Sequence, residues 1–210
     1  MRTHGWNGEP PATDEEAAAR IIAAAHRCVE REGAQTTIAV VATELRVSRA
    51  TVYRYFPSTN ALLLAAAADG TRRFLDRLGA RLSTFDDLAE AVIEGVVHTV
   101  TEVPDEPYLQ LLLDEPSHTL LRHVTSEHAR SIAESILLHR TAIDWSRTRL
   151  ESKDFDELVE WALRIVQSFL SDLGDPPRRA EELREYLRRW LAPSIREWTS
   201  SGQVTGGSRV

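Results

Sequence analysis

The sequence is short of the residues that most covalent and metal chemistry uses. Cys28 is its only cysteine, which excludes an internal disulfide bond and any metal site built on several cysteines. Lys153 is the only lysine, so arginine supplies nearly all of the positive side-chain charge. A glycine-rich phosphate loop, a G-x-S-x-G nucleophile motif and an H-E-x-x-H zinc motif are also missing. We therefore expect that the protein is not an enzyme and that it carries no cofactor and no metal.

Long apolar runs are missing as well. No apolar stretch approaches the roughly 18 residues that a membrane-spanning helix needs. The first dozen residues (MRTHGWNGEPPA) have no apolar centre, so we expect neither a membrane partner nor a secretory signal. With 42% hydrophobic and 27% charged residues over 210 positions, the composition is that of an ordinary globular protein that can bury a full core. These features predict a folded protein of the cytoplasm.

Charge is unevenly distributed along the chain. The net charge of −7 at first argues against a nucleic-acid partner. Between positions 45 and 81, however, seven basic residues accompany two acidic ones, a local charge of +5, whereas positions 82 to 210 carry 14 basic and 23 acidic residues, a local charge of −9. A DNA-reading domain joined to a second domain with another task would show this pattern. Ordinary scatter of surface charge would also produce it.

The hydrophobic periodicity is helical almost throughout, and no alternating strand pattern is present. The predicted fold class is therefore all-α. Pro193 should bend or break the last helix near Arg189, and Gly70 should interrupt the fourth. The expected helices lie at about 13–32, 38–45, 48–57, 58–78, 84–102, a broken region at 108–123, 126–148, 154–173 and 177–198.

Residues 47–56 (VSRATVYRYF) form the most unusual segment. It crowds β-branched and aromatic side chains, which lose rotamer freedom in a helix, among neighbours that are strong helix formers. Thr37 and Ser48 are placed to cap two short helices joined by a three-residue turn, which is a helix-turn-helix arrangement. The inward side of the second helix is expected to hold Ser48, Val52 and Phe56, packed on Ile38, Val41 and Ala42.

The other side of this helix offers a guanidinium, hydroxyls and a phenol around a small alanine that permits close approach. An ordinary solvated face would more often carry Glu, Lys or Gln. Groups of the kind present here bond phosphate oxygens, read base edges and contact thymine methyl groups. We therefore interpret the helix as one that lies against double-stranded DNA. The residues concerned are Arg49, Ala50, Thr51, Tyr53 and Arg54.

Residues 20–63 (RIIAAAHRCVEREGAQTTIAVVATELRVSRATVYRYFPSTNALL) resemble the amino-terminal pattern of the TetR family of bacterial transcriptional regulators. The matching positions keep the family's spacing without a gap; they are Ala24, Ala25, Gly33, Thr37, Ala42, Val47, Ser48, Thr51, Tyr53, Tyr55, Phe56, Ser58, Ala61 and Leu62. The resemblance implies an amino-terminal three-helix DNA-binding domain followed by a larger helical bundle for ligand binding and dimerisation. The implied boundaries are a flexible arm at 1–12, the helix-turn-helix domain at 13–57, a connecting helix at 58–78, the larger domain at 79–198 and a disordered tail at 199–210.

The resemblance also implies which residues contact DNA. Arg46 stands where the family usually has a glycine with φ > 0; that backbone costs an arginine on the order of 1 kcal/mol, while its side chain adds a cation close to the phosphates. Thr59 stands where a phosphate-binding lysine is common and is a weaker, neutral donor. The other expected contacts are Arg49, Ala50 and Tyr53 in the major groove, and Thr37, Ser48, Thr51 and Tyr55 near the sugar-phosphate backbone.

The last two helices carry apolar stripes at helical spacing. Part of each stripe must face its own core. The resemblance implies that these helices also meet their two-fold mates in a four-helix bundle, giving a homodimer that reads a near-palindromic operator. The expected interface residues are Leu158, Ala162, Ile165, Phe169, Leu183, Leu187, Trp190 and Leu191.

The segment 84–102 is apolar over most of its circumference, so we expect it near the centre of a bundle. The resemblance implies that this helix forms the wall of an effector pocket. His139 shares a predicted apolar face with Ile132, Ile136 and Ile143. A core histidine bonded to a backbone carbonyl explains that position as well as a hydrogen bond to an effector does. The expected lining favours a small hydrophobic effector. The lining residues are Phe74, Val96, Leu111, Leu112, His139 and Trp161.

The sequence thus predicts a dimeric, sequence-specific DNA-binding regulator whose partners are double-stranded DNA and a small molecule. Repression relieved by the effector is the usual mode of the family, and activation with the same fold stays open. The resemblance implies that the connecting helix transmits effector binding, with Gly70 as a soft point. The alternative is a helical ligand- or partner-binding protein with a weakened DNA reader, which Arg46, Thr59 and the acidic total motivate.

Overall fold

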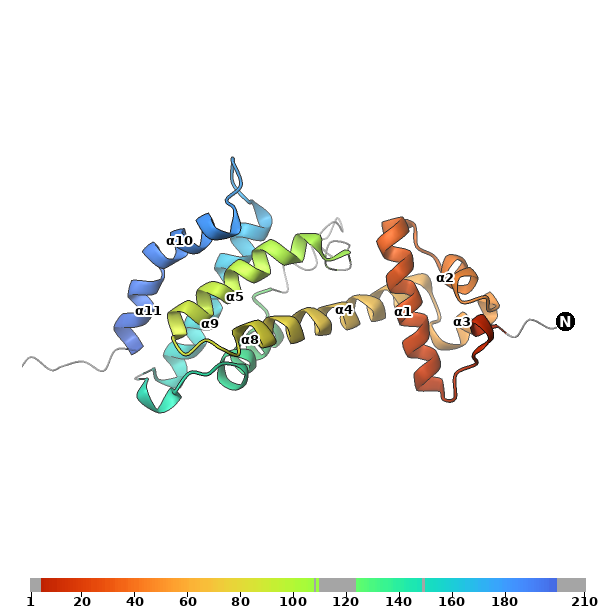
Figure 1. Ribbon diagram of the computed structural model, residues 1–210, viewed down its shortest axis with the longest axis horizontal. Coiled ribbons are helices and arrows are strands. Elements are labelled where there is room, and N and C mark those ends of the chain that lie inside the picture. The colour runs from red at the N-terminus through yellow and green to blue at the C-terminus, as the bar shows by residue number, and fades with distance from the viewer. Residues whose placement is uncertain (1–4, 108, 110–123, 149, 200–210) are drawn as a thin grey trace, which may run out of the picture. The chain divides into compact units, whose positions relative to one another are not determined.

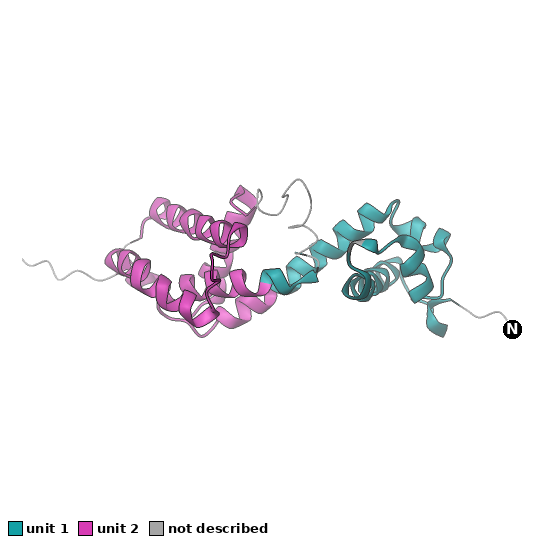
Figure 2. Cartoon of the chain, turned by 90° about the horizontal axis from the view of Figure 1, so that it is seen from above, with its two compact units in different colours: residues 1–75, 103–119 teal, residues 76–102, 120–210 magenta. Residues whose placement is uncertain are grey.

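The computed structural model describes residues 5–107, 109, 124–148 and 150–199. All regular structure in these ranges is helical (Figure 1), which confirms the predicted all-α fold class. The chain forms two compact units (Figure 2): unit 1 comprises residues 1–75 and 103–119, and unit 2 comprises residues 76–102 and 120–210. No helix in the described part of the chain is long and apolar enough to cross a bilayer. The predicted tail, except for Thr199, and most of the predicted broken helix at 108–123 lie outside the described residues.

Unit 1 contains three helices and the first part of a fourth. They are α1 (Asp14–Glu32), α2 (Ile38–Glu44), α3 (Arg49–Tyr55) and α4 (Thr59–Leu82), with the short 3₁₀ turns η1 (Trp6–Gly8), η2 (Gly33–Gln35) and η3 (Val103–Asp105). The first three helices begin one residue after a hydroxyl side chain whose oxygen accepts a backbone N–H of the first turn, namely Thr13, Thr37 and Ser48. Gly33 ends α1 with φ of +56°, which lies in the range that glycine adopts without a steric penalty.

A shared core holds the helix-turn-helix together. Val52 and Phe56 of α3 pack inward as predicted, and burial of each such side chain contributes roughly 1.5–3 kcal/mol, which outweighs the low helix propensity of the segment. Ser48 is exposed, so its predicted inward position is wrong; its hydroxyl faces the first turn of α3 as a cap instead. The buried members are Ile21, Ala24, Ala25, Cys28, Val29, Ile38, Val41, Ala42, Leu45, Val52, Phe56, Leu62, Ala66 and Ala67.

The fourth helix is longer and more regular than predicted. α4 runs through Gly70 without a break and ends at Leu82 instead of position 78. A glycine inside a helix costs about 1 kcal/mol relative to alanine, and the buried Ala66, Ala67 and Phe74 on either side of it outweigh that cost. Because the boundary between the two units falls after Leu75, this one helix contributes residues to both.

Unit 2 is built around one apolar helix. α5 (Leu88–Glu102) packs against α9 (Ser152–Ser171), α10 (Ala180–Trp190) and α11 (Ala192–Thr199), and α8 (Glu127–Arg140) packs against α9 (Figure 1). The turn η4 (Trp145–Arg147) adds an indole that meets the ring of Phe155 edge to face at 5.2 Å. The fully buried members of this core include Ala91, Ile93, Val97, Val159, Leu183 and Ala192.

Backbone hydrogen bonding, or the lack of a donor for it, explains three helix boundaries in unit 2. α5 begins later than predicted because the Asp87 carboxylate accepts the Glu90 N–H at 2.9 Å, which caps the helix. α8 ends at Arg140 instead of position 148, where the Ala142 N–H leaves the helix and donates to the Phe85 carbonyl at 2.9 Å. The predicted break near Arg189 is confirmed at Leu191, because Pro193 has no N–H to donate within the helix.

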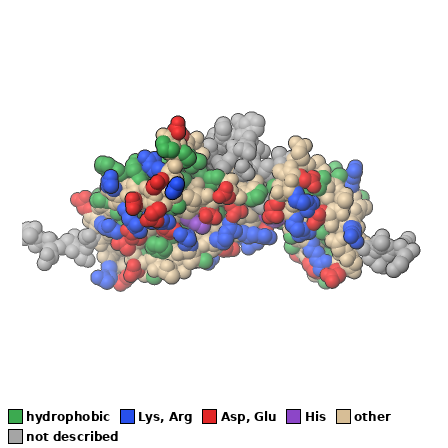
Figure 3. Space-filling model, turned by 45° about the horizontal axis from the view of Figure 1, so that its top comes forward, with side chains coloured by type: hydrophobic (Ala, Val, Ile, Leu, Met, Phe, Trp, Pro, Cys, Tyr) green, Lys and Arg blue, Asp and Glu red, His purple; other side chains and the backbone are tan. Residues whose placement is uncertain are grey.

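Charged pairs join the helices of unit 2 across its core. Glu94 of α5 is buried, and its carboxylate accepts hydrogen bonds from Arg184 Nε of α10 at 2.9 Å and from Arg81 Nε of α4. One turn earlier, Glu90 accepts Arg188 and Arg196, each at 2.9 Å. Figure 3 shows acidic and basic side chains mixed on the visible face of this unit. Several acidic side chains of this unit are thus paired with arginines on neighbouring helices.

Candidate nucleic-acid interface

The residues of the short helix α3 are buried on one side and exposed on the other. Val52 and Phe56 anchor it in the core of unit 1, whereas Arg49, Ala50 and Tyr53 are exposed, and 51% of the Tyr53 surface is accessible. The three exposed residues lie within one turn of each other, so they share one face. They are the residues predicted to enter the major groove. A large aromatic side chain left open beside an arginine is a feature that the stability of unit 1 does not require.

The residues predicted near phosphates surround this face. Ser48 Oγ accepts the Thr51 N–H at 3.0 Å and lies 2.8 Å from Thr51 Oγ1. Thr37 is exposed, and its hydroxyl accepts the Val40 N–H at 3.4 Å. Thr59 is half-buried, because its hydroxyl accepts the Ile38 N–H at 3.5 Å. Thr59 therefore has a second role in the fold, joining the start of α4 to the start of α2.

The turn between α2 and α3 has the conformation expected from the sequence. Arg46 has φ of +54° and an exposed side chain, so the prediction of a left-handed residue at this position is confirmed. Two hydrogen bonds close the turn, from the Arg46 N–H to the Thr43 carbonyl at 3.0 Å and from the Val47 N–H to the Ala42 carbonyl at 2.9 Å. Such bonds satisfy carbonyls at the end of a helix. They also set the direction in which α3 leaves the turn.

A carboxylate that the sequence reasoning missed binds the far end of α3. Asp14 Oδ1 accepts hydrogen bonds from Tyr55 Oη at 2.7 Å and from Arg54 Nη2 at 2.6 Å. The Arg54 guanidinium also lies over the Tyr55 ring, 4.6 Å from its centre. The hydrogen bond from Tyr55, together with the charge of Arg54, lowers the pKa of Asp14, and the same hydrogen bond raises the pKa of Tyr55. Tyr55, predicted to hold a phosphate, is therefore bonded to an acid in this structure.

The segment before α1 was also missed as a structured element. Residues 5–12 belong to the predicted flexible arm, yet the Trp6 N–H donates to the Leu45 carbonyl at 2.9 Å and the indole packs on the core of unit 1. Residues 1–4 lie outside the described residues. The signal in the sequence was a lone tryptophan in a polar stretch, which has no helical or strand periodicity to reveal its partner.

The predicted effector residues do not converge on one cavity. A cavity of about 90 Å³ lies in unit 2, and Val96 is the only one of them on its wall; Phe74 is buried in unit 1, and Leu111 and Leu112 lie outside the described residues. His139 is exposed, so its predicted place on an apolar face is wrong. The cavity is lined by Leu78, Leu82, Ala91, Val92, Gly95, Val96, Thr99, Ala133, Ile136, Leu137, Val159, Ala162, Leu163 and Val166. α8 buries Leu137 at this lining, and His139, two residues later, is on the far side of the helix from Leu137.

The predicted interface residues divide between the core and the surface. Leu183, Leu187 and Leu191 are buried within unit 2, so this part of the predicted interface is not accessible. The reason is that α10 packs along α5. Trp190 is 66% exposed, and the four predicted residues of α9 are half-buried: Leu158, Ala162, Ile165 and Phe169.

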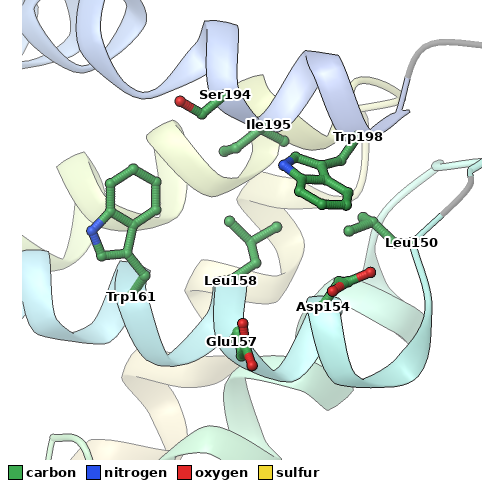
Figure 4. A pocket seen from close by; sticks show the side chains of 8 residues that line it. All are labelled: Leu150, Asp154, Glu157, Leu158, Trp161, Ser194, Ile195 and Trp198. Atoms are coloured by element: carbon green, nitrogen blue, oxygen red, sulfur yellow. The ribbon is translucent and has the colours of Figure 1, made fainter. Parts of the chain in front are cut away.

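Further exposed aromatic side chains lie on α9, α10 and α11. Trp161, Tyr186 and Trp198 are all at least 40% exposed. Figure 4 shows Trp161 and Trp198 on the two sides of Leu158 and Ile195, in a hollow of about 260 Å³ between α9 and α11. Trp161, predicted to line an effector pocket, therefore lies in an open surface hollow. Exposed apolar patches of this kind mark contact surfaces in soluble proteins.

Comparison with known proteins agrees with this geometry. Residues 21–66 match the sequence model of the family described as bacterial regulatory proteins, tetR family. No protein with a curated description matches the chain. Among solved structures, the chain is similar to the TetR family repressor AlkX from Dietzia sp. strain DQ12-45-1b, with 22% identity, a TM-score of 0.57, and coverage of 86% of this chain and 98% of that one. RolR without ligand is similar at 21% identity, with a TM-score of 0.51 and coverage of 88% and 97%.

At these identities the solved structures show the similarity of the fold, and the family model shows the similarity of the helix-turn-helix segment in sequence. The match ends at position 66, four residues before Gly70 of α4. It includes the helix α3 and the turn with its left-handed Arg46. The resemblance predicted from the sequence is therefore confirmed: residues 21–66 match the TetR family model, and the chain has an all-helical fold similar to that of solved TetR-family repressors.

Proposed function

We propose that this protein is a sequence-specific DNA-binding transcriptional regulator, which acts as a homodimer and represses transcription until a small molecule binds. The observation that carries the proposal is the open face of α3, where Arg49, Ala50 and Tyr53 are exposed while Val52 and Phe56 hold the helix in the core. Arginine bonds guanine edges, alanine permits close approach, and the tyrosine offers a ring and a hydroxyl. The protein acts by binding and not by catalysis.

Dimerisation supplies the length of DNA site that a single helix lacks. One short helix reads few base pairs, so two copies would read half-sites about one helical turn apart, roughly 34–36 Å. Trp190 stands at the edge of a hollow of about 300 Å³ between α9 and α10, whose walls include Ile165, Phe169 and Tyr186. A two-fold axis brings such a patch against itself, so the indole of each copy can fill the hollow of the other. This surface replaces the buried leucines of α10 as the proposed contact.

The size of the cavity in unit 2 supports an effector that changes the conformation. A volume of about 90 Å³ is below that of ordinary ligand pockets, about 300–1,000 Å³. A cavity of about 150 Å³ already holds a benzene ring. A single-ring effector would therefore have to move the α4 wall, formed by Leu78 and Leu82, away from α5. A ligand that binds an expanded state shifts the protein toward that state, which is what release from DNA requires.

The lining favours a small, mostly apolar effector. Thr99 is the one polar side chain among the lining residues, and its hydroxyl already donates to the Gly95 carbonyl at 2.7 Å. One of the similar structures is RolR in complex with resorcinol, a single-ring compound, at 23% identity, a TM-score of 0.50 and coverage of 90% of this chain and 95% of that one. That relative motivates screening simple phenols first.

DNA reading is tested by selecting duplexes from a random library with the purified protein. The dissociation constants for the selected duplex and for a random duplex of equal length then follow from fluorescence anisotropy. Arg49→Ala should weaken binding to the selected duplex about 10- to 100-fold, since one bidentate base contact contributes roughly 1–3 kcal/mol. Arg147→Ala is the matched control, because it removes the same charge from an exposed turn of unit 2.

Tyr53→Ala separates base reading from general attraction. Loss of the exposed ring should reduce affinity for the selected duplex more than affinity for the random duplex, because it leaves the charge facing the phosphates unchanged. Equal losses on the two duplexes would show that Tyr53 does not read bases. A protein that enriches no duplex even at low salt would overturn the regulator proposal as a whole.

A further inference from the structure

Residues 5–12 form a strap across the helix-turn-helix, and its first part is bonded to the end of α2. The Trp6 N–H donates to the Leu45 carbonyl at 2.9 Å, and the Asn7 side-chain amide reaches the Glu44 carbonyl at 3.5 Å. Trp6, Asn7 and Gly8 have φ values of +67°, +57° and +96°. Left-handed conformations cost a non-glycine residue about 1–3 kcal/mol and persist only where the surroundings enforce them. The strap is therefore held in place by its contacts.

The second part of the strap is bonded to α1. Arg20 Nη1 donates to the Glu9 carbonyl at 2.5 Å, and the Ala12 N–H donates to Glu16 Oε2 at 2.7 Å. Arg20 and Glu16 also pair with each other at 2.6 Å. Three of the four hydrogen bonds between the strap and its neighbours use backbone atoms of the strap. The position of the strap therefore depends more on the path of its backbone than on the identity of its exposed side chains.

Gly5 brings the strap directly onto the turn before the recognition helix. A Cβ atom at Gly5 would lie 2.9 Å from the Arg46 carbonyl oxygen and 3.0 Å from Val47 Cγ1. The φ of Gly5 is −52°, which any residue can adopt. Glycine is needed at this position because a side chain would collide with the turn, and not because the backbone conformation requires it. The strap therefore lies against the backbone of Arg46, in the turn that sets the direction of α3.

The strap also forms one wall of a hollow beside the DNA side of α3. This open hollow has a volume of about 480 Å³, and Thr51, Arg54 and Tyr55 of α3 form its other wall. Asp14, which follows the strap, binds both Arg54 and Tyr55. The same segment of chain thus contacts the turn before α3 and, through Asp14, the last turn of α3.

We propose that the strap is a positioning element of the DNA reader, which fixes the direction of α3 through Gly5 and Trp6 without touching the bases. The inference rests on the proposed function, because it presupposes that α3 reads DNA. Its physical basis is preorganisation: a helix already held in its bound direction loses less freedom on binding, so the affinity is higher.

The test uses two alanine substitutions of equal chemistry in the full-length chain. Gly5→Ala forces the strap off the turn. Gly79→Ala is the control, because its new Cβ would meet only a flexible methylene of Arg140 at 3.4 Å. Gly5→Ala should raise the dissociation constant for the selected duplex about tenfold, equivalent to about 1.4 kcal/mol. It should change binding to a random duplex less than twofold, since no phosphate-facing charge is altered. Hydrogen exchange at the amides of residues 45–47 should become faster.

Trp6 provides an independent pair of variants. Trp6→Ala should reproduce the effect of Gly5→Ala, and Trp6→Phe, which keeps an aromatic ring against the core, should restore most of the affinity. If the affinities for the selected duplex and for the random duplex both fall in parallel with the thermal midpoint, the strap merely stabilises unit 1 and the inference is wrong. Unchanged affinity of Gly5→Ala for the selected duplex overturns it as well. Failure of the wild type to select any duplex refutes the proposed function itself, which separates the two outcomes.

Discussion

Glu94 should be among the most sensitive positions for the stability of unit 2. Its side chain is 6% exposed and is held between Arg184, which is 16% exposed, and Arg81, which is 50% exposed. Removing one partner of a buried ion pair costs roughly 3–5 kcal/mol when the other charge is left without compensation. Arg184 keeps Glu181 as a second partner at 2.5 Å, and Arg81 reaches solvent. We therefore expect Glu94→Ala to lower the free energy of unfolding by about 2–3 kcal/mol.

Glu90 provides a control on the same helix. It also binds two arginines, Arg188 and Arg196, but its side chain is 23% exposed and both arginines are nearly half exposed. Exposed pairs contribute about 0.2–1 kcal/mol, so Glu90→Ala should cost less than 1 kcal/mol. Thermal unfolding followed by circular dichroism should show the midpoint of Glu94→Ala lowered by roughly 5–10 °C. If the two variants lose the same stability, burial does not decide the strength of these pairs and the reasoning is refuted.

The same carboxylate predicts how stability responds to acid. Burial by itself raises the pKa of Glu94, but the hydrogen bonds from Arg184 and Arg81 outweigh burial and bring the pKa below its usual value of 4.5. The unfolded chain therefore takes up the proton more readily than the folded chain. The contribution of Glu94 is complete above pH 4.5 and is lost as the pH falls below that value. Glu94→Gln should flatten the decline of the thermal midpoint in this acidic range.

Three further substitutions test the reader and the dimer surface. Asp14→Asn should release Arg54, raise affinity for a random duplex severalfold and steepen the salt dependence of binding by about one unit of slope; an unchanged slope in salt titrations would count against a DNA-facing Arg54. Arg46→Gly should raise the free energy of unfolding by about 0.5 kcal/mol in chemical denaturation, because relief of the left-handed strain exceeds the added entropy of the unfolded chain; a loss of stability would mean that contacts of the arginine side chain matter more. Trp190→Glu should convert the dimer to a monomer in sedimentation experiments at micromolar concentration, and a persistent dimer would exclude the hollow between α9 and α10 as the contact.

Local features of unit 1 could be predicted from the sequence because their causes lie within a few residues. The hydroxyls of Thr37 and Ser48 cap the helices that follow them, and the left-handed backbone of Arg46 was implied by the family resemblance, in which a glycine is usual at this position. The exposure of Tyr53 and the burial of Val52 follow from helical periodicity on a segment anchored at both ends. The strap was missed because a bond from a backbone N–H to a carbonyl some forty positions away leaves no trace in the side-chain pattern.

The middle of the chain was harder, since each helix there has more than one apolar neighbour. His139 was placed on an apolar face because Ile132, Ile136 and Ile143 share its helical spacing. The spacing assumed a helix to position 148, whereas α8 ends at Arg140, so Ile143 belongs to a different segment and adds nothing to that face. The inward side of α8 is set by Ala133 and Leu137. The error in the predicted end of the helix thus led to the error in the predicted burial of His139.

The orientation of α10 shows what periodicity alone leaves undetermined. Its apolar residues fall in two adjacent rows, one with Leu183 and Leu187 and the other with Tyr186 and Trp190, and either row could face the core. The charged residues decide between them. Arg184 and Arg188, one turn apart, bind Glu94 and Glu90, also one turn apart, in antiparallel order. Two such bonds fix both the register and the rotation of α10 on α5.

With α10 rotated in this way, the leucine row is sealed against α5 and the aromatic row is turned outward. The exposure of Trp190 is therefore a consequence of the arginine–glutamate ladder and not of an excess of apolar residues. The same ladder includes Arg81 of α4 through Glu94, so the helix that lines the small cavity and the helix that presents Trp190 share one buried carboxylate. We therefore expect a ligand that displaces the α4 wall to work against this link, so that the proposed dimer surface would be coupled to the cavity by charge as well as by packing.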